Sequence, residues 1–433
     1  MNIRLYNARI LTMEKARPMF RGEIWVKNDK IACVVNSDEL KKEDMKDFPK
    51  IAWDGEIDCR DNLLMPGFKN AHTHSAMVFL RSYADDLPLD KWLTEKIFPA
   101  EKKLTEEDIF YLTRLAVLEY LTSGITSIFD MYLTSDSTAE ACLDTGMRCV
   151  LTSGLNDFTS SVEKMEEQYN RWNRKNSLIS YQLGFHAEYT CSKELLYHVA
   201  QLAHKYHAPV FTHLAETRRE VEECRAKYGM TPAVFLETMG IFDFGGGGFH
   251  CVHMTSDDID VFSRRRLSVI TNPASNLKLA SGICPVAEFT RRRIPVAIGT
   301  DGAASNNSLN MFREMFLVAG LSKMREENAA SLDAEKVLRM ATADGAKVMC
   351  LPKCDVLAKG KQADIIMIDL YQPNMQPLHD IQGNLVYSCS KSNVCMTMIN
   401  GRVLYRNGDF FVGESVDRIY GECERIVKRI LSV

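Results

Sequence analysis

The chain has 433 residues, of which 46% are hydrophobic and 25% are charged, and its net charge is −4. This composition is typical of a globular protein, and the weak negative charge excludes a global basic field that would attract nucleic acid or anionic lipid. No apolar run approaches the roughly 20 residues that a membrane span needs, and the first residues lack the apolar core and cleavage site of an export signal. We therefore expect a cytoplasmic protein that binds neither nucleic acid nor membrane.

The two ends of the chain, residues 1–64 and 352–433, read as short alternating strands separated by polar turns. IRLYNARILTM and GEIWVKNDKIACVV near the start, and ADIIMIDL and VCMTMINGRVLYRNG near the end, show this pattern. Neither end carries enough apolar residues for a core of its own. We expect both ends to pair into one small β-sandwich domain.

Residues 65–351 alternate short β-rich runs with longer helical patterns, which is typical of parallel strands joined by helices. One helix is predicted within Thr105 to Gly124, and another within Cys191 to Pro209 with Ser192 as its N-cap. The candidate strands are LLMPGF, TSIFDM, RCVLTSG, ISYQLGFH, PVFTHL, GFHCVHM, LSVITN and PVAIGTD. Eight such units predict an α/β fold, a (β/α)8 TIM barrel. We interpret the run Gly245 to Gly248 as a flexible loop before the sixth strand.

The thirteen cysteines are an odd number without a regular framework, so we interpret them as reduced thiols. The one close pair, Cys350 and Cys354, could form a metal clip. Because no second pair follows in zinc-finger spacing, two ordinary thiols are the favoured interpretation.

Polar residues recur where the predicted strands end, and barrels of this kind place their active residues at that edge. These residues are His72, His74, His186, His213, His250 and Asp301. Residues two apart in a strand point to the same face, so His72 and His74 can turn both imidazoles toward one ion. A lone His-X-His pattern is weak evidence, whereas its recurrence at successive strand ends favours a metal. Three imidazoles and a carboxylate suit zinc or a similar divalent ion, with room for water.

Four stretches, MPGFKNAHTHSAM, FTHLAET, FHCVHM and IGTDGAASNNSLNMF, resemble signatures of the amidohydrolase superfamily. The similar branch uses one metal ion and includes cytosine, guanine and adenosine-type deaminases and the triazine hydrolases. Members with two metals carry a bridging lysine or carboxylate at the fourth strand, where this chain has GFHAEYTC. The resemblance implies one divalent ion, Zn2+ or else Fe2+ or Mn2+, with His72, His74, His213 and Asp301 as its ligands.

The resemblance also implies the catalytic groups of a hydrolytic deaminase, which breaks a C–N bond of a cyclic amidine. Activated water adds to the ring carbon, Glu216 protonates the adjacent ring nitrogen, and Asp301 carries a proton from water to the departing amine. His250 orients the nucleophile and stabilises developing charge. Of the two histidines in FHCVHM, His250 matches the family position, and we expect a supporting role for His253.

The stretch from Leu80 to Phe110 closely resembles one subgroup, the deaminases of 5′-methylthioadenosine, S-adenosylhomocysteine and related adenosine compounds. The substrate contacts that this implies are Glu101 at the ribose hydroxyls, His186 near the base and sugar, Trp92 as an apolar wall, Arg148 near the sugar end and Ser305 beside the metal aspartate. Without the resemblance, we would interpret Glu101 as one of the charged residues at a helix start and Trp92 as a residue of the hydrophobic core. A carboxylate at the ribose favours nucleosides over nucleotides.

The sequence departs from the subgroup at Ser153, where many relatives carry a basic residue, and at Ala187 and Glu188, where Ser-Pro is common. The identity of the preferred 5′ substituent, among homocysteine, methylthio, hydroxyl and hydrogen, therefore stays open. Two other functions also stay open, namely a deaminase or chlorohydrolase of guanine, a pterin or an s-triazine, and a non-catalytic barrel scaffold. A scaffold would be expected to lose a metal position, and none is lost here. The resemblance further implies a homodimer or homotetramer.

Overall fold

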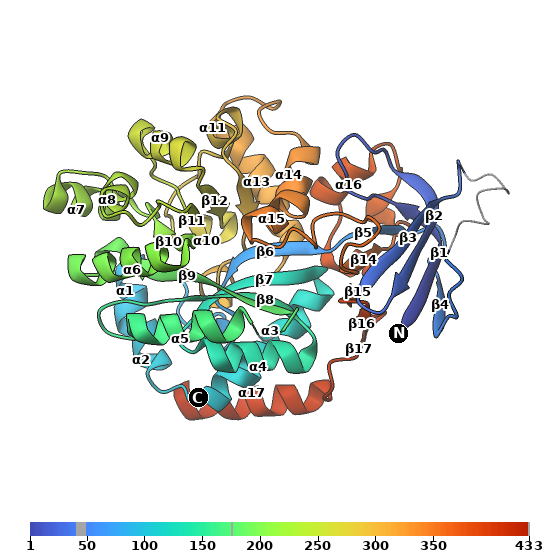
Figure 1. Cartoon of the computed structure of the whole chain (residues 1–433), viewed down its shortest axis with the longest axis horizontal. Helices are drawn as coiled ribbons and strands as arrows, with labels where there is room; N and C mark the ends of the chain where they lie inside the picture. Colours follow the sequence, from blue (N-terminus) through green and yellow to red (C-terminus); the bar gives the residue numbers. More distant parts are fainter. Residues whose placement is uncertain (40–48, 175, 432–433) are drawn as a thin grey trace.

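The computed structural model describes residues 1–39, 49–174 and 176–431, and they form two sheets with helices around them. One sheet has eight parallel strands, β6 to β13, in the order of the sequence. The other is a nine-stranded mixed sheet in which strands from both ends of the chain lie side by side, blue and red at one end of the molecule in Figure 1. The predicted α/β class, with a barrel and a second sheet built from both termini, is confirmed.

The barrel strands are β6 (Phe68–Thr73), β7 (Ile125–Tyr132), β8 (Arg148–Ser153), β9 (Ile179–Ala187), β10 (Val210–Leu214), β11 (Gly246–His250), β12 (Ser268–Thr271) and β13 (Val296–Ile298). The ring closes between β6 and the residues that follow β13. The Asp301 amide donates to the His72 carbonyl at 3.0 Å, and the Thr300 amide donates to the Asn70 side chain at 2.8 Å. Closure therefore places Asp301 beside the histidines of the first strand.

Two expectations about the barrel strands are wrong. Within LLMPGF, Leu63–Pro66 forms β5 of the mixed sheet and pairs with β14, so the first barrel strand begins at Phe68 and His72 lies inside it. The glycines Gly246 to Gly248 are strand residues of β11 rather than a loop. A Cβ on Gly246 would lie 1.9 Å from the Val210 carbonyl oxygen, so glycine permits the close approach of β11 to β10.

Helices cover the outside of the barrel, as expected for βα units. They are α3 (Glu106–Thr122), α4 (Ser135–Thr145), α5 (Val162–Trp172), α6 (Lys193–Tyr206), α7 (Arg218–Tyr228), α8 (Pro232–Thr238), α9 (Ser256–Arg265), α10 (Pro273–Lys278), α11 (Val286–Arg291), α12 (Ala303–Asn306), α13 (Met311–Arg325), α14 (Ala334–Met340) and α15 (Ala343–Val348). Both predicted helices are present. Thr105 and Asp108 cap each other's backbone amides at the start of α3, and the Ser192 hydroxyl accepts from the Leu195 amide in α6.

Short elements connect the first two barrel strands above the carboxyl edge. They are η2 (Ser75–Leu80), α1 (Leu89–Lys91), the π-helical turn η3 (Trp92–Ile97) and α2 (Phe98–Glu101). This connection carries Trp92 and Glu101, two residues that the sequence assigns to the substrate.

The strands of the mixed sheet are β1 (Asn2–Ile10), β2 (Phe20–Lys27), β3 (Lys30–Asn36), β4 (Gly55–Asp58), β5 (Leu63–Pro66), β14 (Ile365–Ile368), β15 (Val394–Ile399), β16 (Arg402–Arg406) and β17 (Asp409–Phe410). The two chain ends join where β14 pairs antiparallel with β5. The sheet has its own apolar core, to which Leu5, Ile24 and Met396 contribute. The exact division into domains at residues 64 and 352 stays a prediction.

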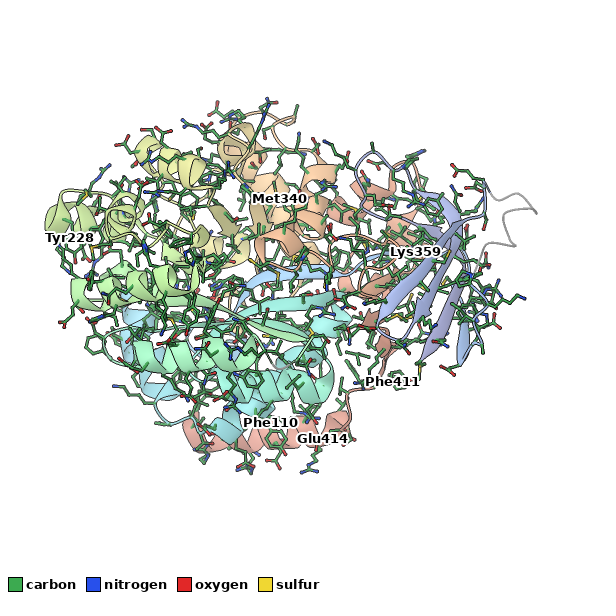
Figure 2. All side chains as sticks on the ribbon, viewed as in Figure 1. Phe110, Tyr228, Met340, Lys359, Phe411 and Glu414 are labelled. Carbon is green, nitrogen blue, oxygen red and sulfur yellow. The ribbon has the colours of Figure 1, made fainter. Side chains whose placement is uncertain are left out.

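The C-terminal helix α17 (Val416–Leu431) does not join the mixed sheet but packs along the barrel beside α3. Figure 2 labels Phe411 and Glu414, where the chain passes from the mixed sheet to α17. Glu414 forms an ion pair with Arg114 of α3 at 3.2 Å, and Lys103 donates to the carbonyl of Ile430 at 2.9 Å. Residues 416–431 therefore cover the barrel, although the sequence assigns them to the small domain.

Two further observations concern the whole described chain. Among the described residues, no helix is long and apolar enough to cross a bilayer. All thirteen cysteines are free, and of the close pair Cys350 is exposed and Cys354 is buried.

Candidate active site

The four expected metal ligands converge at the carboxyl edge of the barrel. Nε2 of His72 lies 3.2 Å from Nε2 of His213 and 3.6 Å from Oδ1 of Asp301. Nε2 of His74 lies 3.2 Å from the same Asp301 oxygen. His250 also belongs to the cluster, because one nitrogen each of His72, His213 and His250 lie within 4.8 Å of one another. Side chains of residues more than 200 positions apart in the sequence therefore meet at one buried site.

Backbone carbonyls fix the orientation of two of these imidazoles. Nδ1 of His74 lies 2.5 Å from the Met131 carbonyl oxygen, and Nδ1 of His213 lies 2.7 Å from the His186 carbonyl oxygen. A carbonyl only accepts, so each Nδ1 carries a hydrogen and donates it. In His213 the lone pair then sits on Nε2, which faces the cluster, as in metal-binding histidines. Burial lowers the pKa of His74, but contact with Asp301 outweighs it and raises the pKa to about 9, so a metal ion would have to displace a proton from Nε2 of His74.

The electrostatics of the cluster favour a bound cation. Burial, helped by repulsion from neighbouring imidazoles, lowers the pKa of His72 and of His213 well below 6.5, so both rings are neutral. Burial opposes ionisation of Asp301, yet contact with His74 outweighs it and holds the pKa of that carboxyl well below its usual range. Nε2 of His213 presents its lone pair, and Asp301 presents a negatively charged oxygen, at the same point as Nε2 of His72. Imidazole nitrogen and carboxylate oxygen are donors that Zn2+ prefers, so the residues fit a divalent metal.

The second oxygen of Asp301 is held by two serines. The hydroxyl of Ser275 donates to Oδ2 at 2.5 Å, and the hydroxyl of Ser305 donates to it at 2.8 Å. Ser305 therefore lies beside the metal aspartate, where the resemblance puts it, whereas Ser275 is a partner that the sequence analysis missed. With Oδ2 occupied, Oδ1 is the oxygen that faces the histidines.

Glu216 lies beside His250, at the edge of the cluster. Oε2 of Glu216 lies 3.7 Å from Nε2 of His250, and Ser281 donates to the other Glu216 oxygen at 3.2 Å. Burial raises the pKa of Glu216. Nδ1 of His250 donates to the Asn276 side-chain oxygen at 2.7 Å, which directs Nε2 toward Glu216.

The loop that carries Glu216 is anchored by a second buried carboxylate. Glu220 accepts from the backbone amides of Ala215 at 2.6 Å and of Glu216 at 2.8 Å. His253 lies outside the cluster, because its Nε2 contacts the Ser281 carbonyl at 2.7 Å. Both residues hold the loops that position Glu216 and Ser281.

Three supporting residues, Ser275, Asn276 and Ser281, come from one segment that the sequence analysis did not single out. This segment, TNPASNLKLASG, follows β12 at the same edge as the metal candidates. Its position after the seventh strand and its density of small polar residues are the signal that could have found it.

Two expected substrate residues lie at the cluster. The His186 ring centroid is 5.0 Å from that of His213, and burial lowers the pKa of His186 to about 4, so the ring is neutral. Glu101 lies beside Tyr132 and near His74, and burial raises its pKa to about 7. Trp92 is only 6% exposed and belongs to the main apolar core. The connection between β6 and β7 therefore brings Glu101 to the carboxyl edge.

The expected role of Arg148 at the sugar is wrong, because Arg148 lies at the opposite end of the barrel. It is the first residue of β8, whose carboxyl end is Ser153, about 16 Å away at 3.3 Å per residue. Its guanidinium pairs with Asp364 through two bonds of 2.6 and 3.0 Å, and both side chains are buried. Arg148 thus ties the amino end of the barrel to the mixed sheet.

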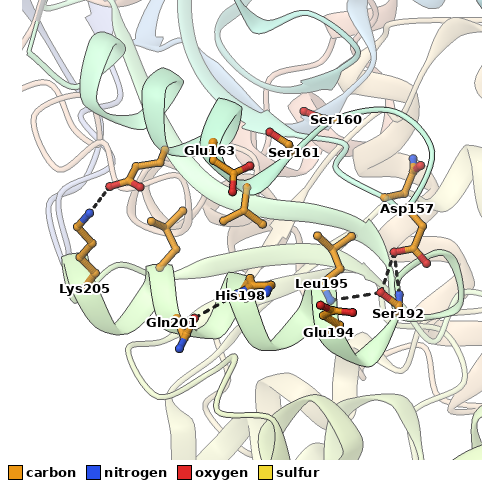
Figure 3. Close-up of a pocket in the computed structure, with 14 residues that line it drawn as sticks. Asp157, Ser160, Ser161, Glu163, Ser192, Glu194, Leu195, His198, Gln201 and Lys205 are labelled. Atoms are coloured by element: carbon orange, nitrogen blue, oxygen red, sulfur yellow. Dashed lines mark hydrogen bonds and ion pairs between the residues drawn. The ribbon is translucent and has the colours of Figure 1, made fainter.

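A groove of about 500 Å3 lies on the outside of the barrel, between α5 and α6 (Figure 3). Polar side chains line it, among them Asp157, Glu163, His198 and Gln201. None of the expected metal, catalytic or substrate residues lies in it. Its acidic and hydroxyl groups bond to one another, as Asp157 does with Ser192, so it competes poorly with the buried cluster as a reactive site.

Comparison with known proteins decides the family. Residues 63–404 match the amidohydrolase family. The chain belongs to this family. This amidohydrolase is 37% identical to the 5-methylthioadenosine/S-adenosylhomocysteine deaminase of Caldanaerobacter subterraneus subsp. tengcongensis, over 100% of this chain and 99% of that protein. It is 40% identical to the deaminase of the same name from Pelotomaculum thermopropionicum, over 93% of both chains.

Among solved structures, this amidohydrolase is similar to an adenosine deaminase from Xanthomonas campestris with bound zinc. The TM-score is 0.92 and the sequence identity 31%, over 100% of this chain and 98% of that one. The family resemblance of the four sequence stretches is therefore confirmed.

Proposed function

We propose that this amidohydrolase is a metal-dependent deaminase of adenosine-type nucleosides, with 5′-methylthioadenosine and S-adenosylhomocysteine as its substrates. It releases ammonia and forms the corresponding inosine analogue. The observation that carries the proposal is the convergence of His72, His213 and Asp301 with Glu216 at one buried point. Relatives that match this chain over their full length are named as deaminases of these two compounds.

The metal supplies, when bound, water activated as a nucleophile near neutral pH. His72, His74, His213 and Asp301 would hold it, and Zn2+ suits these donors best, with Fe2+ or Mn2+ as alternatives. The zinc in the structure of the Xanthomonas adenosine deaminase supports this choice. One metal ion is expected, because His186 lies at the end of β9. Family members with two metal ions carry a bridging lysine or carboxylate at the corresponding strand.

The protein's own groups move the protons. Glu216, whose pKa burial raises, gives a proton to the purine ring nitrogen next to the carbon that is attacked, and it recovers a proton from the hydroxyl of the adduct as the carbonyl forms. Asp301 accepts the proton that the attacking water loses and passes it to the departing amine, while Ser275 and Ser305 hold its carboxylate in place. His250 presents Nε2 toward Glu216 and stabilises the charge that develops on the reacting oxygen.

Glu101 supplies recognition of the sugar. Its carboxylate accepts hydrogen bonds from a ribose diol and repels a phosphate, so nucleosides are preferred to nucleotides. His186 stands between the cluster and the η4 turn (Glu188–Thr190), where a neutral imidazole can bond the nucleoside. The homodimer or homotetramer implied by the resemblance stays a prediction that light scattering on the purified protein tests.

A panel of substrates tests the proposal directly. Ammonia release is measured with 5′-methylthioadenosine, S-adenosylhomocysteine, 5′-deoxyadenosine, adenosine, guanine, cytosine and a chloro-s-triazine, with metal analysis of the same preparation. We expect turnover of the adenosine compounds and almost none of the free bases or the triazine. Turnover of guanine or the triazine alone would assign a different heterocycle, and absence of any turnover by metal-loaded protein would contradict the enzyme.

A further inference from the structure

Glu314 of α13 is a fully buried carboxyl group that bridges two short helices next to the cluster, and burial raises its pKa to about 8. One of its oxygens accepts from the backbone amide of Ala274 in α10 at 3.0 Å. The other accepts from the Asn306 side-chain nitrogen in α12 at 2.8 Å. Helices α10 and α12 follow the seventh and the eighth barrel strands. A single side chain from the outer layer therefore holds the two loops that close the metal cluster.

Each residue that Glu314 holds is the immediate neighbour of a serine that binds Asp301. Ser275 follows Ala274, and Ser305 precedes Asn306. Both hydroxyls donate to Oδ2 of Asp301, at 2.5 and 2.8 Å. The position of Glu314 thus determines where both serine hydroxyls stand.

A second connection runs from Glu314 to the backbone of Asp301. The Asn306 nitrogen that donates to Glu314 also donates to the carbonyl of Thr300 at 2.6 Å. The Thr300 amide in turn bonds to Asn70 of β6. Glu314 therefore acts on both the carboxylate of Asp301 and the peptide that precedes it, while it touches no metal ligand itself.

We propose that Glu314 is a positioning residue of the metal centre. Through Ser275 and Ser305 it holds Asp301 in the rotamer that turns Oδ1 toward His72 and His74. Such outer partners of metal ligands commonly change metal affinity or activity by about 10–100-fold when they are removed. This inference rests on the proposed metal centre but not on the identity of the substrate.

The variant Glu314→Gln tests this role. An amide has one acceptor end and one donor end, and both neighbours of Glu314 are donors, so one of the two bonds becomes a donor–donor contact in either orientation. We expect zinc affinity to fall by about 10–100-fold when it is measured by competition with a chelator above pH 8, where Glu314 is ionised, and well below the melting temperature of the variant. In turnover assays kcat should fall while KM for the nucleoside changes little, because Glu101 and His186 keep their contacts.

Asp258→Asn is the matched control. Asp258 is also a fully buried carboxylate at a helix start, and it accepts from the Thr231 hydroxyl at 2.5 Å and the Thr255 amide at 2.9 Å. It bonds to none of the residues that hold Asp301. This control should lower the melting temperature and leave zinc affinity unchanged.

A double-mutant cycle tells whether Glu314 affects zinc binding through Ser275 and Ser305 or by destabilising the fold as a whole. The double variant Ser275→Ala/Ser305→Ala should bind zinc more weakly than the wild type. Adding Glu314→Gln to this double variant should lower the zinc affinity by less than about a further twofold. Full additivity of the two effects, or wild-type zinc affinity in Glu314→Gln, would overturn the proposal. If Glu314→Gln does not fold, unchanged zinc affinity in the serine double variant overturns it equally. Because zinc binding is measured without substrate, the result is independent of whether nucleosides are deaminated.

Discussion

Replacing Glu216 with glutamine separates proton transfer from folding and metal binding. The amide oxygen of the introduced glutamine can still accept from Ser281, which donates to the native glutamate at 3.2 Å, so the side chain keeps its place. An amide cannot deliver a proton to the purine ring, so the contribution of general acid catalysis is lost. That contribution is typically 10²–10⁴-fold, or about 2.7–5.4 kcal/mol of transition-state stabilisation.

The assay is steady-state deamination of 5′-methylthioadenosine by metal-loaded wild-type and Glu216→Gln protein, with zinc content measured in parallel. We expect kcat to fall by about 10²–10⁴-fold at full zinc occupancy. Ser281→Ala is the control, because it removes one hydrogen bond and should cost only about tenfold. Near-normal turnover by Glu216→Gln would refute the assignment of Glu216 as the acid.

Three further variants test other parts of the account. His72→Ala should lose the metal, as elemental analysis of the purified protein would show, while the circular dichroism spectrum stays that of the folded barrel. Glu101→Ala should raise KM for nucleosides and leave any activity on free bases unchanged. Because the pKa of Glu101 is raised to about 7, wild-type KM should also rise as pH falls below 7, and this dependence should vanish in the variant. Arg148→Met should cost about 3–5 kcal/mol of unfolding free energy in denaturant melts, since Asp364 keeps an unpaired buried charge, with KM unchanged.

The metal cluster could be predicted from the sequence because its residues sit at repeated places. His72 and His74 share a face through the two-residue period of a strand, and His213 and Asp301 follow at other strand ends. The parallel order of β6 to β13 then brings these edges together. Periodicity and order along the chain are enough for such a prediction, and the structure brings the four side chains to one buried point.

The partners of strand residues were not predictable in the same way, although the predicted strand RCVLTSG already places Arg148 at its amino end. Arg148 matches a motif, yet it lies at the amino end of β8 and pairs with Asp364 from a distant segment. The run from Leu63 to Phe68 is apolar throughout, so the break at Gly67 between two sheets leaves no trace in its hydrophobicity. Composition alone does not say which sheet a buried strand joins.

Residues whose role depends on tertiary contacts were not predicted, for a different reason. Ser275 and Glu314 are ordinary residues of helix starts and amphipathic helices. Only the packing of α10 and α12 against α13 brings Ser275 to Asp301 and Glu314 to the backbone beside Ser275. The helix α17 was missed although Ile419, Cys423, Ile426 and Ile430 recur at helical spacing. The helical pattern does not show whether α17 packs against the barrel or against the mixed sheet, because that depends on tertiary contacts.

Anomalous scattering at the zinc edge, from crystals of the metal-loaded protein, tests the central claim most directly. The account predicts one strong peak at the carboxyl edge, about 2.0–2.2 Å from Nε2 of His72, His74 and His213 and from an oxygen of Asp301. His250 and Glu216 should stand beside the peak without coordinating it. A map without a peak among these four side chains, or with the ion bound elsewhere, would contradict the account.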